Sequence, residues 1–285
     1  MYVGVLTHCL KANLEEVFAW MQQEGIHYAE LGGHHVDEII KKTPDEVKEL
    51  CKKYDITITA LGKYPNNLHK NRILRKIANK QTYELIDAAG KFGIPCISTF
   101  VGYNDSMDYR GNMKKFFSIF KPMAEYAAKQ NVKIAIENCP MKREFHFTGG
   151  NLMITPEIFG EMFTNMPKNF GLNFDPSHLF WQFVDPAIVV EEFADRIFHT
   201  HAKDTLIDKE RLKFAGIYGK MVYRYVIPGR GGINWKEYLA SLKENGYTGT
   251  LSLEHEDADY YGNEDMKKKG ILEGKAFLDN ILGEI

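Results

Sequence analysis

Short apolar runs rich in β-branched residues alternate with longer segments of helical pattern along the whole chain. The apolar runs are six to nine residues long and lie between turn-forming residues, which is typical of strands buried in a sheet. The eight predicted strands are residues 2–7, 27–32, 56–62, 96–102, 132–138, 169–175, 196–204 and 248–256.

Residues that start or stop helices lie between these runs. Five helix starts are expected, each at a capping residue with glutamate three positions later or proline at the next position: Asn13, Thr43, Thr155, Asp185 and Asn234. Helix ends are expected at glycine, as at Gly25, Gly93 and Gly246. Eight strand–helix units in 285 residues predict an α/β protein, a (β/α)8 TIM barrel forming one domain over residues 1–285.

A doubly wound open sheet is the alternative architecture. Its first strand–helix turn would carry a glycine fingerprint for a dinucleotide, which this chain lacks. One segment breaks the regular rhythm, because residues 205–227 separate the seventh strand from its helix. Long loops in compact domains often cover or line binding sites, so we expect 205–227 to be an active-site loop insertion.

Four strands in the second half of the chain end in residue types that bind metal ions: Glu137, Asp175, His201 and Glu254. Alternate side chains of a barrel strand point to the barrel axis and to the surrounding helices. This alternation places all four on the axial face, at the carboxyl ends where barrel active sites lie. In the seventh strand it also places Ile197 and His199 on the axial face and Phe198 on the outer face.

Three carboxylates brought together without a cation would repel one another, so the pattern indicates a divalent metal ion. Oxygen ligands with one imidazole favour Mn²⁺, with Mg²⁺, Co²⁺ and Zn²⁺ as alternatives. The absence of thiolates from the set argues against a structural zinc site. The pattern implies no redox cofactor.

Composition and charge narrow the class of protein. The formal net charge of −2 offers no field for holding nucleic acid, and no apolar run is long enough to span a membrane. The first residues do not read as a signal peptide, and four dispersed cysteines favour a reducing compartment, so we expect a cytoplasmic protein. Cys139 is expected to be a buried structural thiol. Whether the chain forms a homo-oligomer is left open.

Five motifs give the chain a resemblance to the xylose isomerase-like TIM barrels, and in particular to the sugar phosphate isomerase/epimerase group with its ketose 3-epimerases and inosose-processing enzymes. The motifs are IAIENCP (134–140), NFDPSHLFWQ (173–182), HTHAKD (199–204), IPGRGGINW (227–235) and LEHED (253–257). The resemblance implies that Glu137, Asp175, His201 and Glu254 bind one metal ion and that His178 contacts substrate oxygens. It also implies an assisting arginine and glutamate, for which Arg224, Arg143 and Glu144 are the nearby residues.

These observations predict a metal-dependent sugar or sugar phosphate isomerase or epimerase. The metal would acidify a carbon-bound hydrogen of a chelated ketose and stabilise the resulting enediolate. Glu137 and Glu254 would act as the two acid/base carboxylates. Further substrate contacts are expected from four residues near strand ends: His8, Glu30, Lys203 and Asp204.

Three alternatives remain. The same enediolate could expel a hydroxyl group, which would make the protein an inosose-type dehydratase. An endonuclease IV-like metal nuclease shares the barrel and the pattern of Asp175 and His178, but needs further histidines at earlier strand ends. A non-catalytic sugar-binding barrel would retain the fold without the metal.

Overall fold

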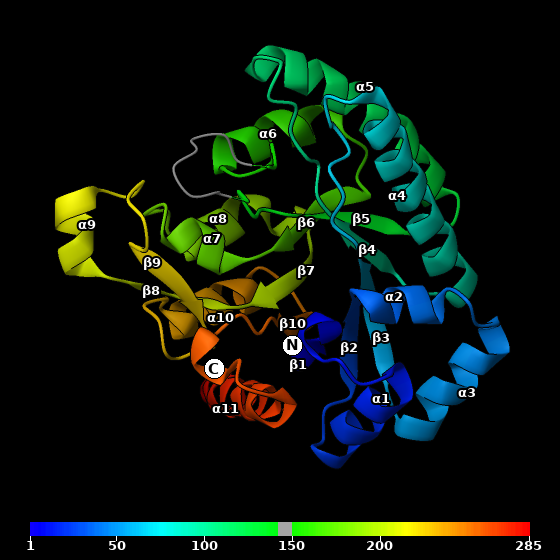
Figure 1. Cartoon of the computed structure of the whole chain (residues 1–285), viewed down its shortest axis with the longest axis vertical. Helices are drawn as coiled ribbons and strands as arrows, with labels where there is room; N and C mark the ends of the chain where they lie inside the picture. The colour runs from blue at the N-terminus through cyan, green and yellow to red at the C-terminus, as the bar shows by residue number, and fades with distance from the viewer. Residues whose placement is uncertain (142–149) are drawn as a thin grey trace.

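A computed structural model of the chain describes residues 1–141 and 150–285, and its centre is a closed barrel of eight parallel strands (Figure 1). The strands are β1 (Tyr2–Leu6), β2 (Tyr28–Gly32), β3 (Thr57–Gly62), β4 (Cys96–Thr99), β5 (Lys133–Glu137), β6 (Phe170–Phe174), β7 (Ile197–Ala202) and β10 (Thr250–Leu253). They follow one another around the barrel in chain order, and β10 closes it by pairing with β1. The predicted (β/α)8 TIM barrel is confirmed.

Helices surround the barrel on its outside (Figure 1). The α-helices are α1 (Leu14–Gln23), α2 (His34–Ile39), α3 (Pro44–Tyr54), α4 (Arg72–Phe92), α5 (Tyr109–Ala128), α6 (Pro156–Asn165), α7 (Pro176–Phe180), α8 (Pro186–Phe193), α9 (Lys209–Ala215), α10 (Trp235–Glu244) and α11 (Glu264–Glu284). Short 3₁₀ helices are η1 (Thr7–Cys9), η2 (Ala194–Arg196) and η3 (Ala258–Tyr260). Among the described residues, none of these helices has the length and apolarity needed to cross a membrane.

The expected helix boundaries are confirmed. All five predicted capping residues, Asn13, Thr43, Thr155, Asp185 and Asn234, immediately precede a helix. The side chains of four of them accept a backbone N–H of the first turn, and Thr155 is the exception. Gly25, Gly93 and Gly246 have φ values of 64°, 67° and 81°, the left-handed conformation that glycine adopts most easily.

The strand alternation expected for β7 is interrupted by a bulge. Leu172 of β6 pairs with Ile197, but the next residue, Asn173, pairs with His199, so Phe198 is an extra residue. Ile197 therefore joins the main hydrophobic core, and Phe198 packs against a separate small cluster that contains Ala135. The prediction that Ile197 faces the axis and Phe198 faces outward is wrong, because the bulge reverses the alternation.

Residues 205–227 form a hairpin outside the barrel. Strands β8 (Asp204–Ile207) and β9 (Tyr223–Val226) pair antiparallel, and α9 lies between them. Figure 1 shows α9 standing away from the barrel. No residue of α9 is buried, and Phe214 near its end is 91% exposed. The hairpin brings β9 back to the carboxyl end of the barrel, next to the site described below.

Candidate metal centre

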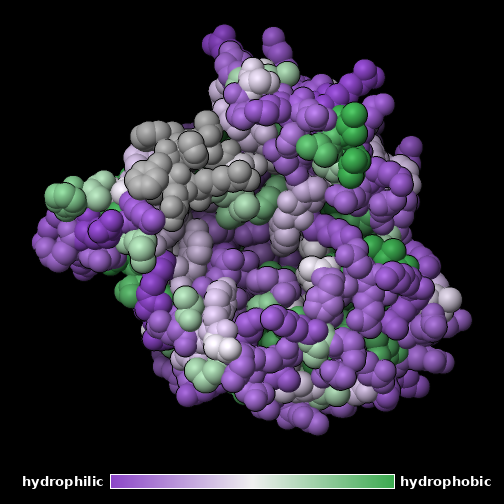
Figure 2. Space-filling view, viewed as in Figure 1, coloured by the Kyte–Doolittle hydropathy of each residue, from purple (hydrophilic) through white to green (hydrophobic). Residues whose placement is uncertain are grey.

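The four strand-ending residues converge at the carboxyl end of the barrel. Glu137 ends β5, Asp175 follows β6, His201 lies near the end of β7, and Glu254 follows β10. Each offers one donor atom, and these atoms all lie within 4.8 Å of one another. All four residues are buried. Figure 2 shows mostly hydrophilic residues around the hollow in the middle of the face it presents.

The imidazole of His201 is oriented from inside the barrel. Its Nε2 lies 2.9 Å from Glu30 Oε2, and both side chains are fully buried. Tyr64 donates its hydroxyl hydrogen to the other Glu30 oxygen at 3.2 Å. In the neutral ring, a carboxylate that accepts the Nε2–H leaves Nδ1 free to bind a metal ion, which is how second-layer carboxylates prepare histidine for a metal ion.

Two buried atoms of the cluster, Asp175 Oδ2 and His201 Nδ1, face other ionisable side chains. Lys203 and His178 lie 3.1 and 3.2 Å from Asp175 Oδ2, and Glu254 Oε2 lies 3.1 Å from His201 Nδ1. Asp175 uses its other oxygen to cap α7 by accepting the N–H of Ser177 at 2.8 Å. Buried carboxylates gathered this closely need positive charge beside them, which these side chains or a metal ion can supply. The donor set of three carboxylates and one imidazole suits a hard divalent cation. These residues therefore fit a metal ion.

The electrostatics of the cluster favour positive charge. Burial acts to lower the pKa of His201, but the carboxylates of Glu30 and Glu254 outweigh it and hold that pKa well above its usual value. Burial also acts to raise the pKa of Glu254, but Lys203 and His201 hold it well below its usual value. The cluster thus keeps Glu254 ionised and attracts cations.

His178 contacts the cluster from α7. Its Nε2 lies 3.2 Å from Glu137 Oε1 and 3.2 Å from Asp175 Oδ2. Its Nδ1 lies 2.8 Å from the hydroxyl of Tyr225, which comes from β9 of the hairpin. Burial and Glu254 act to raise the pKa of Glu137, but hydrogen bonds from His178 and His201 lower it to about 2.

Lys203 is a buried cation that also contacts the cluster. Its Nζ lies 2.6 Å from Glu254 Oε2, 3.1 Å from Asp175 Oδ2 and 3.0 Å from Glu256 Oε2. The ring of Tyr225 lies 4.6 Å from the same ammonium group. His8 comes within 4.8 Å of Glu254 and Glu256 through its ring nitrogen. Both Lys203 and His8 therefore border the space above the cluster.

Three residues expected at the substrate lie in other surroundings. Glu30 is fully buried behind His201. Asp204 is also fully buried, and its carboxylate accepts N–H groups of the loop after β9, including Gly229 and Gly231 at 3.1 and 3.2 Å. Arg224 is half-exposed and pairs with Asp257 and Asp259 at 3.2 and 3.0 Å. Arg143 and Glu144 lie outside the described residues.

Sequence patterns missed two residues of the site and misjudged a third. Tyr225 lies within the expected loop insertion, but only the hairpin places its hydroxyl beside His178. Asn173 shares the axial face of β6 with Asp175, a signal that alternation contained, and its amide lies 2.8 Å from His201 Nε2. Cys139 is partly exposed and lies near Glu137 and His178, so the expectation of a buried structural thiol is wrong.

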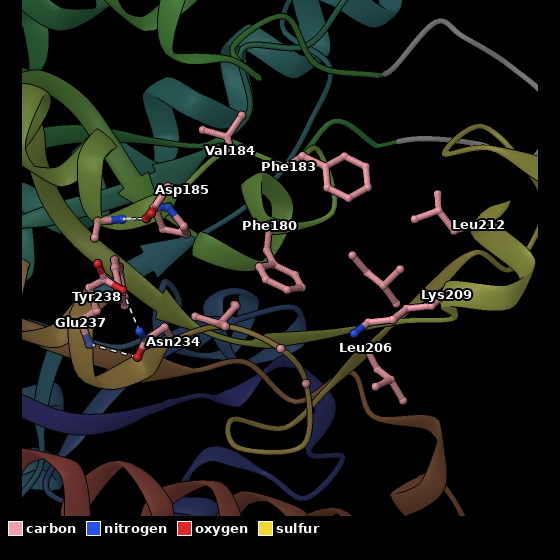
Figure 3. A pocket seen from close by; sticks show the side chains of 16 residues that line it. Phe180, Phe183, Val184, Asp185, Leu206, Lys209, Leu212, Asn234, Glu237 and Tyr238 are labelled. Carbon is pink, nitrogen blue, oxygen red and sulfur yellow. Dashed lines mark hydrogen bonds between the residues drawn. The ribbon is translucent and has the colours of Figure 1, made fainter.

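A separate cavity of about 760 Å³ lies between the hairpin and the outer helices (Figure 3). Phe180 and Phe183 line one side, Leu206 and Leu212 of the hairpin line another, and Tyr238 of α10 also lines it. Its lining is mainly apolar and includes none of the four cluster residues. The cavity is therefore distinct from the candidate metal centre.

Comparison with known proteins identifies similar chains. A family model described as xylose isomerase-like TIM barrel matches residues 18–281. Uncharacterized protein YfiH of Bacillus subtilis is 33% identical over 135 residues, which cover 44% of this chain and 40% of YfiH. Uncharacterized protein MJ1311 of Methanocaldococcus jannaschii is 28% identical over 279 residues, covering 94% of this chain and 83% of that protein. Inosose dehydratase of Clostridium tetani is 28% identical over 138 residues, covering 47% and 44%.

Solved structures share the fold over nearly the whole chain. A D-tagatose 3-epimerase-like protein aligns with a TM-score of 0.76 and 23% identity, covering 99% of this chain and 97% of its own. The IOLI protein with a bound zinc atom aligns with a TM-score of 0.73 and 17% identity, covering 100% and 97%. At these identities the likeness establishes the barrel architecture.

Proposed function

This chain belongs to the xylose isomerase-like TIM barrel family, and on that premise we propose that it is a metal-dependent isomerase or epimerase of sugars or sugar phosphates. The observation that carries the proposal is the convergence of four buried donor residues, whose donor atoms all lie within 4.8 Å of one another. Glu137, Asp175, His201 and Glu254 would hold one divalent ion, Mn²⁺ in our proposal. Such an ion would polarise the carbonyl and hydroxyl oxygens of a ketose and acidify the hydrogen on the adjacent carbon.

Glu137 and Glu254 are the proton carriers in this proposal. The pKa of each lies below its usual value, so both are carboxylates at neutral pH and either can accept a proton. Each has its own basic partner, His178 for Glu137 at 3.2 Å and Lys203 for Glu254 at 2.6 Å. One carboxylate would remove the proton and the other would return one to the opposite face or to the neighbouring carbon.

Three further side chains are proposed to contact substrate: His178, Lys203 and His8. They border the cluster, and each can donate a hydrogen bond to a hydroxyl group. Glu30, Asp204 and Arg224 take other roles in this proposal. Glu30 orients His201, Asp204 fixes the loop after β9, and Arg224 is held by Asp257 and Asp259.

A dehydratase is the second candidate. It is favoured by the sequence similarity to proteins named inosose dehydratase. Lys203 also supports it, because a buried ammonium group beside the cluster could donate a hydrogen bond to a hydroxyl group that leaves as water. Both candidates begin with the same proton removal and differ in whether the carbon–oxygen bond then breaks.

The test is proton exchange in heavy water. Ketoses, ketose phosphates and inososes are incubated with the protein and Mn²⁺ in heavy water, and products are followed by NMR. An epimerase or isomerase leaves deuterium on an intact sugar, whereas a dehydratase yields an unsaturated product. If none of these compounds exchanges hydrogen for deuterium, the proposal is contradicted.

Glu137→Gln and Glu254→Gln are the informative variants. Loss of an acid/base group is expected to reduce exchange by roughly 100-fold or more. Because both residues also belong to the metal set, bound metal is measured for each variant by elemental analysis. Glu157→Gln on the outer helix α6 is the matched control and should exchange at the wild-type rate.

A further inference from the structure

Three side chains with a softer donor set lie at the edge of the metal centre. A thiol, an imidazole nitrogen and a carboxylate oxygen from Cys139, His178 and Glu137 all lie within 4.8 Å of one another. Cys139 is partly exposed, whereas Glu137 and His178 are buried. The set shares Glu137 with the four-residue cluster, but it replaces hard oxygen donors by sulfur.

The backbone that carries the thiol is held rigidly. Asn151 is buried, and its side-chain amide donates to the carbonyl oxygens of Glu137 and Cys139 at 2.8 and 3.1 Å. Between these two residues, Asn138 exchanges two hydrogen bonds with the backbone of Asp175, at 2.8 and 2.9 Å. The third donor, His178, is fixed through Tyr225. Because hydrogen bonds hold the backbone in place, the three donor atoms keep their positions relative to one another, as a binding site requires.

We propose that Glu137, Cys139 and His178 form a second metal site that is selective for soft cations such as Zn²⁺ and Cd²⁺. Ligands around tetrahedral zinc lie roughly 3 to 4 Å apart, so small side-chain rotations suffice to bring the three donors into range. Binding breaks the S–H bond of Cys139 and the Nε2–H bond of His178, forms sulfur–metal and nitrogen–metal bonds, and releases these protons to solvent. Thiolate selects soft cations over Mn²⁺ and Mg²⁺, which prefer oxygen.

Occupation of this site would block catalysis. Glu137 would be withdrawn from proton transfer, and His178 would no longer face substrate. Zinc and cadmium would therefore inhibit the manganese-loaded protein, with Cys139 as the residue that confers sensitivity. The inhibition rests on the proposed function, whereas binding of the soft cation does not.

The binding test uses Cd²⁺ alone as the probe. The protein is first saturated with Mn²⁺ and then titrated with Cd²⁺, and the ultraviolet charge-transfer band of cadmium–thiolate is recorded. Wild type should develop the band with one equivalent, and Cys139→Ser should not. Cys51→Ser is the matched control, because Cys51 is also partly exposed but lies on α3, and it should keep the band.

His178→Ala distinguishes a built site from a reactive surface thiol. Loss of the imidazole should weaken Cd²⁺ binding at least tenfold, with thermal unfolding confirming that the variant is folded. A band that persists in Cys139→Ser, or an affinity unchanged in His178→Ala, would overturn the proposal. In the exchange assay, Zn²⁺ inhibition should be at least tenfold weaker in Cys139→Ser. If the cadmium band appears but no compound exchanges, the second metal site is supported and only the proposed function is contradicted.

Discussion

Glu30 Oε2 lies 2.9 Å from His201 Nε2, and neither side chain is exposed to solvent. The pair joins the second strand of the barrel to the seventh, and it sets which imidazole nitrogen faces the metal centre. A residue that looked like a substrate contact at a strand end thus supports a candidate metal ligand.

Replacing Glu30 by Gln should weaken metal binding. The variant keeps the size of the side chain but loses the charge that holds the Nε2–H, so Mn²⁺ affinity should fall roughly 10- to 100-fold. Isothermal titration calorimetry with Mn²⁺ measures the change in affinity. Glu15→Gln, at an exposed carboxylate paired with Lys53, is the control and should bind normally. Equal affinity in Glu30→Gln and wild type would refute the positioning role.

Asp204 should matter to stability because its carboxylate holds the loop after β9. It accepts N–H groups from Thr205, Gly229, Gly231 and Ile233 and from the Trp235 indole, at 2.8 to 3.2 Å. Asp204→Asn presents an amide hydrogen to these donors and should lower the free energy of unfolding by about 2–4 kcal/mol. Urea unfolding provides the measurement. Asp208→Asn, at the exposed cap of α9, should change it by less than about 1 kcal/mol.

Only glycine should fit at position 171, because the bulge at Phe198 brings the neighbouring strand very close. A Cβ atom at Gly171 would lie 2.1 Å from the Arg196 carbonyl oxygen and 2.6 Å from the Phe198 ring. Gly171→Ala should therefore destabilise the protein by about 1–3 kcal/mol or more, as overpacked cores do. The matched variant is Gly160→Ala inside α6, where the nearest atom is 3.9 Å away. It should be neutral or stabilising in the same unfolding experiment.

His35 should make stability depend on pH. Its Nε2 donates to the Ala12 carbonyl at 2.9 Å, and its Nδ1 lies 2.9 Å from the Thr7 hydroxyl, which can donate to it. Burial lowers the pKa of His35 below its usual value near 6.5. The neutral ring is thus favoured in the folded state. The contribution of His35 to the free energy of unfolding is complete above pH 6.5. It is lost as the pH falls towards the lower folded-state pKa.

The pH effect can be isolated by comparing variants. The difference in unfolding free energy between pH 7.5 and pH 5.5 should shrink in His35→Gln, because glutamine does not titrate. His27→Gln, at an exposed histidine, should leave that difference as in wild type. If both variants behave alike, His35 is not the titrating group.

The barrel and the four-residue cluster were both predictable from the chain. Strand alternation and helix caps are local properties, because they depend on side chains within a few residues of one another. The eight strands, the helix starts and the axial placement of Glu137, Asp175, His201 and Glu254 follow from them. Parallel strands in a closed barrel must bring their carboxyl ends together, so topology completed the cluster without further information.

Contacts between distant segments were decided only by the tertiary structure. The bulge at Phe198 adds a residue to one strand, and alternation cannot register that because it assumes a regular pleat. Glu30 lies 171 residues from His201, and Tyr225 lies 47 residues from His178. Their partners depend on how the barrel closes and where the hairpin folds back. Local sequence therefore determined which side chains face the axis where the strands are regular, and long-range packing determined the bulge and what each side chain touches.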